Sequence, residues 1–156
     1  MKISKKIEPV VAGISASIVI GVLAFLSFET STGFWLMFSF GSTTLIVLIF
    51  YESEFAQPGN IFFGHLIGIV IGILFNELIG ISFVTLGLAV GTAVTLMMYF
   101  KVIHPPAAAN PLIALFADVS LEYIVFPVIA GAVLIIFLSV IINKFILQRN
   151  YPTRWF

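Results

Sequence analysis

The feature that most constrains this chain is a series of six long stretches that contain no Asp, Glu, Lys or Arg. An apolar helix of about 20 residues crosses the hydrocarbon core of a bilayer, where backbone groups must be hydrogen-bonded within the protein. We therefore expect each stretch to be helical and the chain to cross a membrane several times. The stretches cover residues 10–28, 33–50, 61–76, 81–100, 105–117 and 123–142.

The length of these stretches predicts an all-α helix bundle with five full spans. The fifth stretch, Pro105–Ala117, is too short for an upright span and is predicted to be a half helix or a re-entrant helix. With 61% hydrophobic and 9% charged residues, against about 25% charged in soluble domains, the chain has too little polar surface for a separate soluble domain. We therefore expect residues 1–156 to form a single transmembrane domain, without an enzymatic or nucleic-acid-binding part.

The distribution of charge predicts the orientation, because Lys and Arg remain on the cytoplasmic side. The basic residues are Lys2, Lys5, Lys6, Lys101, Lys144, Arg149 and Arg154. All of them fall on one side if the six stretches all cross, and the opposite turns then hold Glu29, Glu77, Asp118 and Glu122. This favours six crossings of the cell membrane with both termini in the cytoplasm. Whether Pro105–Ala117 crosses or re-enters stays open at this point.

A weak internal repeat is also present. Shifting the chain by 50 residues aligns Gly41 and Ser42 with Gly91 and Thr92. This suggests parallel helical-hairpin repeats, the third of them abbreviated. Coincidence explains the few identities equally well.

The most unusual segment begins with His104, Pro105 and Pro106 and continues to Asn110. Two consecutive prolines interrupt a helix, and irregular backbone at membrane depth occurs only where it is buried in protein or lines a cavity. One interpretation is a tight turn between helices, and the other places His104 and Asn110 at the mouth of a solute path.

A second segment, Gln57, Pro58, Gly59 and Asn60, precedes the third stretch, and Gln57 and Asn60 are candidates for the same solute path. We expect Asn60 and Asn110 to cap the helices that follow them. Their helix N-termini would then attract an anion without a cationic side chain.

His65 lies within a predicted span, where an ionisable residue suggests function. It is interpreted either as a group that binds an anion or moves a proton, or as a structural histidine bonded to a neighbouring helix. Ser42 and Thr43 are candidates for the same path, although their hydroxyls can also bond back to the preceding turn. Protonation of His65 would add positive charge to such a path.

Small residues and missing ligands complete the pattern. Gly64, Gly68 and Gly72 share one helix face and predict close helix packing. No carboxylate lies within a stretch and the chain has no cysteine, so we expect no enzymatic activity, no metal site and no cofactor.

These motifs resemble those of the HPP family of integral membrane proteins. The resemblance is carried by Phe40-Gly41-Ser42, by the segment from Ala56 to Leu66, by His104-Pro105-Pro106 and the residues up to Leu112, and by Asn150-Tyr151-Pro152 with Trp155. It implies about four spans and, for some photosynthetic members, nitrite transport into plastids or cyanobacterial cells. This sequence departs from the family pattern at two positions. Ala108 stands where Gly is common after the two prolines, and Gly59 stands where a basic residue often follows Gln-Pro.

From the residues and the resemblance together we expect a small-solute transporter or channel. Nitrite or a similar small monovalent anion is the expected substrate, with the lipid bilayer as surroundings and a homo-oligomer as the expected assembly. The alternative is a membrane scaffold or partner subunit without its own permeation path.

Overall fold

The computed structural model describes residues 4–156, and this part of the chain is helical and contains no strand. The prediction of an all-α fold is therefore confirmed. The α-helices are α1 (Glu8–Phe28), α2 (Ser39–Ile49), α3 (Pro58–Leu78), α4 (Phe83–Tyr99), α5 (Asn110–Ala117) and α6 (Ala130–Ile141). A 3₁₀ helix, η2 (Pro105–Ala109), leads into α5, and π-helical turns extend α6 at both ends to give Ile124–Ile146.

The prediction of five full spans is wrong. Three helices are long and apolar enough to cross a membrane: Glu8–Phe28, Pro58–Leu78 and Ile124–Ile146. The other apolar helices, Ser39–Ile49, Phe83–Tyr99 and Pro105–Ala117, are shorter. The chain is a multi-pass membrane protein in which long and short helices are mixed.

The second stretch is shortened because residues 33–38 are not helical. Gly33 has a φ of +115°, and the Ser27 hydroxyl accepts hydrogen bonds from the amides of Trp35 (2.9 Å) and Leu36 (3.0 Å). These amides are thus satisfied without a helix, and α2 begins only at Ser39. With 11 residues, α2 is about 16 Å long.

The fourth helix starts later than its apolar stretch, and the fifth helix is short. The Ser82 hydroxyl accepts from the Thr85 amide at 3.1 Å and caps α4, which then has 17 residues. The fifth helix, α5, is short as expected and ends at Ala117, and the Asp118 that follows it has a φ of +48°. The Asp118 carboxylate accepts from Asn76 Nδ2 at 2.6 Å, which places the end of α5 beside the end of α3.

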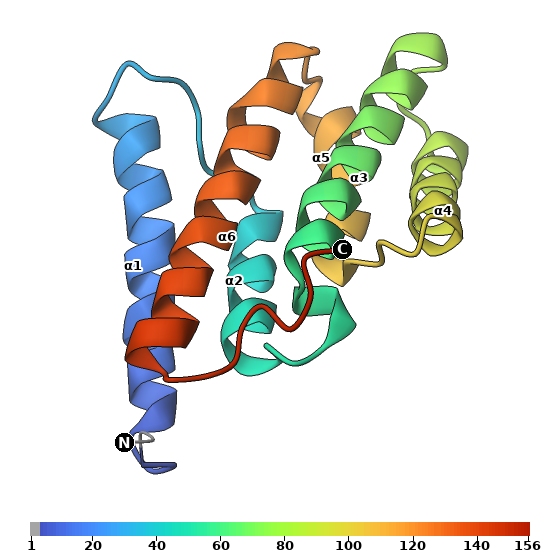
Figure 1. Cartoon of the computed structure of the whole chain (residues 1–156). Coiled ribbons are helices and arrows are strands. Elements are labelled where there is room, and N and C mark those ends of the chain that lie inside the picture. Colours follow the sequence, from blue (N-terminus) through green and yellow to red (C-terminus); the bar gives the residue numbers. More distant parts are fainter. Residues whose placement is uncertain (1–3) are drawn as a thin grey trace.

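The helices lie side by side and alternate in direction, with α3 in the centre (Figure 1). It packs against α4, α5, α6 and η2, while α6 also contacts α1 and α2. Arg149 pairs with Glu8, and Arg154 lies 3.6 Å from Glu54, at the end where the chain starts. We call this the basic end; the Asn76–Asp118 contact marks the opposite, acidic end. Lys2 lies outside the described residues.

The outer surface is strongly apolar. Phe38, Phe83 and Leu78 are 93%, 88% and 79% exposed. Such side chains are unfavourable in water and would contact lipid in a membrane.

The predicted hairpin repeat stays a prediction. Gly41 and Gly91 have similar surroundings, since an added Cβ would meet nothing within 4 Å at either position. Gly131 on α6, by contrast, packs tightly against Phe40 and Trp35.

Candidate functional site

A fully buried polar network lies where α2, α3 and the segment before η2 meet. Thr43 Oγ1 lies 2.8 Å from His65 Nε2 and 2.9 Å from His104 Nε2. All three side chains are 0% exposed. One hydroxyl on α2 therefore bridges two imidazoles, those of residues 65 and 104, which are 39 positions apart in the sequence.

The network continues on both sides of this bridge. His104 Nδ1 lies 2.7 Å from the Phe55 carbonyl. Asn110 Nδ2 lies 3.0 Å from His65 Nδ1 and 3.0 Å from the His65 carbonyl. The Ser39 hydroxyl donates to Asn110 Oδ1 at 2.9 Å. The chain of contacts thus runs from Ser39 through Asn110, His65, Thr43 and His104 to a backbone carbonyl.

One arrangement of protons satisfies every contact of the two imidazole rings while both rings are neutral. The Phe55 carbonyl only accepts, so His104 Nδ1 donates and its Nε2 accepts from the Thr43 hydroxyl. Thr43 can then accept from His65 Nε2, which leaves His65 Nδ1 to accept from the Asn110 amide. A further proton on His65 would face an amide donor. The geometry therefore favours neutral histidines in this conformation.

Glycines on α3 allow His104 and the residues that follow it to pack closely against this helix. A Cβ on Gly64 would lie 2.7 Å from the Cβ of His104, and one on Gly68 would meet the Ala107 carbonyl and lie 3.0 Å from the Cβ of Asn110. At Gly72 it would lie 2.6 Å from the Cβ of Ala114. The face formed by Gly64, Gly68 and Gly72 is therefore filled by η2 and α5 of the same chain.

The prolines position His104 at the entrance of the fifth segment. Pro105 and Pro106 form the first turn of η2, where a missing amide proton costs little. His104 itself has extended backbone (φ −137°, ψ 100°), which turns its ring toward α3. The His104 and His65 ring centroids are 4.9 Å apart, and the Phe40 ring meets His65 edge-on at 5.1 Å.

The predicted capping roles of two asparagines are wrong. Asn60 lies inside the first turn of α3, whose N-cap is Gln57, and its Nδ2 donates to the Ile103 carbonyl at 2.9 Å. Asn110 is the first residue of α5, but η2 precedes it directly and its side chain bonds to His65. Both side-chain amides instead make contacts between segments, because α3 already begins at Pro58 and η2 leads directly into α5.

Gln57 and Gly59, on either side of Pro58, hold the C-terminal residues against the start of α3. The Gln57 side chain donates to the carbonyls of Tyr51 (2.9 Å) and Ser53 (2.8 Å) and accepts from the Thr153 amide (2.9 Å). The Gly59 amide donates to the Trp155 carbonyl at 2.8 Å. This end of α3 is thus occupied by the chain itself and is not open to an anion.

Ser42 lines a crevice of about 540 Å³ between α2 and the fifth segment. Ser39 lies in the same wall, and Ala109, Leu112 and Phe116 form the opposite one. Because the Ser39 hydroxyl also bonds to Asn110, the crevice and the buried network meet at this residue. Sequence reasoning missed Ser39, although it lies one turn before Thr43 and so shares its helix face.

Two glycines that the sequence pattern singles out lie away from the buried network. Gly41 and Gly91 face open space on α2 and α4 and do not touch the network. Within residues 4–156, no group of three or more His, Cys, Asp or Glu residues could hold a metal ion.

Comparison with known proteins supports a transmembrane protein. A family model described as "HPP, transmembrane region" matches residues 2–152. Two transmembrane proteins of Dictyostelium discoideum are similar: one is 28% identical over 125 residues, covering 75% of this chain and 44% of the relative, and the other is 29% identical over 153 residues, covering 91% and 49%. The chain thus spans about half the length of these curated relatives. No solved structure matches.

Proposed function

Because this chain belongs to the HPP transmembrane family, we propose that it carries a small solute across a membrane, most specifically nitrite or a similar small monovalent anion. The observation that carries the proposal is the junction at Ser39, where a crevice between two helices reaches a buried polar network. Buried polar groups in a membrane protein are costly and mark solute paths. The choice of nitrite rests on the family resemblance.

The network offers hydrogen-bond donors to an anion. The Ser39 hydroxyl donates to Asn110, the Asn110 amide to His65, and the Thr43 hydroxyl to His104. An anion that enters from the crevice would replace Asn110 Oδ1 as the acceptor of the Ser39 hydroxyl, and hydrogen bonds to a charged acceptor are stronger than neutral ones. No Lys or Arg lies in this set, so binding is weak enough for release.

The conformation described here is the closed one. The donors of the network are bonded to acceptors of the same network. Passage of a solute therefore requires that α2 moves away from α3 and the fifth segment. The path then runs from the crevice past Asn110, His65 and Thr43 to His104 and the basic end. Neutral histidines can donate or accept along this route without a fixed charge.

The basic end faces the cytoplasm in this proposal. Lys5, Lys6, Lys144, Arg149 and Arg154 are at or near it, and basic residues are retained on the cytoplasmic side of cell membranes. Both described ends of the chain lie there.

Nitrite flux into proteoliposomes tests the proposal. We expect uptake above that of empty liposomes, and a several-fold reduction in Ser39→Ala, which removes the donor at the junction. Ser17→Ala is the matched control, because the exposed Ser17 hydroxyl bonds only to the Gly13 carbonyl of its own helix (3.1 Å). Folded protein without flux in either direction would refute the proposal, as would equal flux in the two variants.

A scaffold or partner subunit is the second candidate function. The Gly64–Gly68–Gly72 face is already filled by the same chain, but an added Cβ on Gly87 or Gly91 of α4 would meet nothing within 4 Å. If this face assembles copies of the chain, Gly87→Leu should lower the oligomer fraction in detergent. Loss of assembly with no flux in the parent protein would favour the scaffold.

A further inference from the structure

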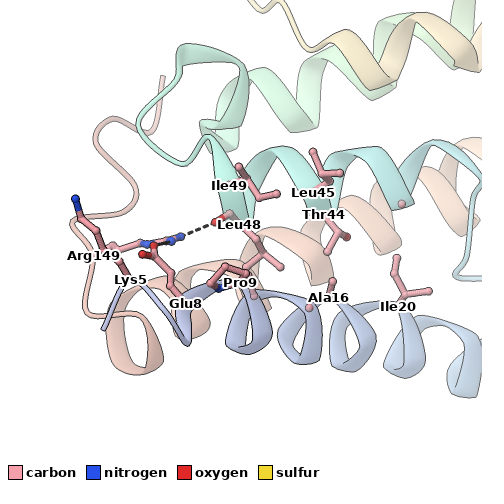
Figure 2. Close-up of a pocket in the computed structure, with 13 residues that line it drawn as sticks. Lys5, Glu8, Pro9, Ala16, Ile20, Thr44, Leu45, Leu48, Ile49 and Arg149 are labelled. Carbon is pink, nitrogen blue, oxygen red and sulfur yellow. Dashed lines mark hydrogen bonds and ion pairs between the residues drawn. The ribbon is translucent and has the colours of Figure 1, made fainter. Parts of the chain in front are cut away.

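A cavity of about 530 Å³ lies between α1 and α2, away from the buried network (Figure 2). Its walls are mostly apolar, with Ala12, Gly13, Ala16 and Ile20 on α1 and Gly41 and Leu45 on α2. An added Cβ on Gly13 or Gly41 would meet nothing within 4 Å, so the two glycines leave the groove open. The lining residues on α1 run from Glu8 to Ile20, about 18 Å of helix, so the groove is long enough for much of a hydrocarbon chain.

One hydroxyl in this wall has no partner. Thr44 is 1% exposed, and its Oγ1 makes no hydrogen bond. Figure 2 shows the side chain pointing from α2 towards α1. A buried hydroxyl without a partner is costly, and in helices threonine normally bonds back to the preceding turn. A ligand in the groove that carries an acceptor would remove this cost after a small rotation of the side chain.

The end of the groove at the basic end is charged. Lys5, Glu8 and Arg149 line it, and they carry a net charge of +1, from two cations and one anion. Arg149 pairs with Glu8, whereas Lys5 is not in either ion pair of the described residues. This end therefore attracts one negative charge.

We propose that the groove binds an anionic phospholipid of the surrounding bilayer. Its phosphate would face Lys5 and Arg149, an ester carbonyl would accept a hydrogen bond from Thr44, and one acyl chain would lie along Gly41, Gly13 and Ile20. Thr44 lies one helical turn, about 6 Å, deeper than Leu48 at the charged end. The glycerol of a phospholipid separates phosphate from ester by a comparable few bonds.

Two other occupants fit less well. A free fatty acid carries all its oxygens at the headgroup and would leave Thr44 without a partner. A helix from a second copy has its backbone carbonyls bonded internally and offers no acceptor along an apolar face. Only a molecule with a charge, then an acceptor, then hydrocarbon matches the order of groups in the groove.

Native mass spectrometry of the purified full chain in mild detergent tests the proposal. The protein is mixed with phosphatidylglycerol, phosphatidylcholine or oleate, one at a time. The groove is blocked with Gly41→Leu, with Gly91→Leu as matched control, since Gly91 is equally open but lies on α4. The acceptor contact is removed with Thr44→Val, with Thr95→Val as control, because the exposed Thr95 hydroxyl bonds to the Gly91 carbonyl of its own helix (2.8 Å).

We expect one phosphatidylglycerol per chain, retained in both controls and reduced at least ten-fold in Gly41→Leu. Thr44→Val should weaken retention roughly five-fold, as expected for one neutral hydrogen bond. Equal retention of phosphatidylglycerol and phosphatidylcholine, preference for oleate, lipid-free dimers, or unchanged retention in Gly41→Leu would each overturn the proposal. If Gly41→Leu does not fold, the Thr44→Val to Thr95→Val comparison decides. Because flux plays no part, failure here leaves the proposed transport function unaffected.

Discussion

Replacing Thr43 with valine tests the buried network most directly. Valine has nearly the same shape, so packing is kept while the bridging hydroxyl is lost. His65 Nε2 and His104 Nε2 then lose the partner that lies 2.8 and 2.9 Å away. Each stranded polar group costs about 1–3 kcal/mol when buried. The expected loss is therefore about 2–6 kcal/mol in the free energy of unfolding.

Thermal unfolding in detergent, followed by circular dichroism, measures this loss. For a chain of this size each kcal/mol lowers Tm by about 2–4 °C, so we expect Thr43→Val to lower Tm by about 5–20 °C. Thr43→Ser keeps the hydroxyl and should melt near the parent protein. Thr95→Val removes an exposed hydroxyl and should change stability by about 0.5 kcal/mol or less. If Thr43→Val melted with the parent protein, the hydroxyl would not bridge the histidines and the reasoning would fail.

Three further predictions concern packing, the C-terminal residues and topology. Gly68→Ala should destabilise the protein by about 1–3 kcal/mol, because its methyl group would meet the backbone of η2, whereas Gly91→Ala on open α4 should be neutral or slightly stabilising in the same melt. Gln57→Leu removes the acceptor of amides near the C-terminus; their hydrogen exchange should accelerate at least ten-fold, and unchanged protection would show that other contacts hold them. Since the chain has no cysteine, single cysteines at Lys5 and Glu77 should react with an impermeant maleimide from opposite sides of the membrane, and reaction from one side would refute the alternating arrangement.

Sequence patterns predicted the kinds of element and not their ends. Apolar runs without charge are sufficient to predict helices in a bilayer, and these runs are all largely helical in the structure. The length of each helix depended on competing hydrogen bonds. The Ser27 hydroxyl accepts from the amides of Trp35 and Leu36, so α2 does not extend back towards Gly33. Ser82 caps α4, which therefore begins two residues after the start of its apolar stretch. Such contacts depend on tertiary placement, which a hydrophobic run does not contain.

The candidate site shows the same division. His65, His104, Thr43 and Asn110 were each singled out by type and position, and the structure brings all four together. The way they bond was not predictable, because the Thr43 bridge joins segments that are distant in sequence. Asparagine before a helix suggested a cap, but the preceding 3₁₀ turn removes the open amides that a cap would bind. Gln57 was assigned to a path and instead holds the C-terminal residues.

The contacts of those last residues have a consequence for biosynthesis. The Tyr151 hydroxyl donates to the Ala56 carbonyl at 2.7 Å, and the Gly59 amide at the start of α3 donates to the Trp155 carbonyl. A ribosome has therefore made almost the whole described chain before the start of α3, the central helix, receives its partners. Multi-pass chains emerge N-terminus first, so the earlier helices must wait in the membrane with this region incomplete. A stop codon placed before Tyr151 should consequently yield chains that insert normally but are degraded, because both of these contacts are then missing.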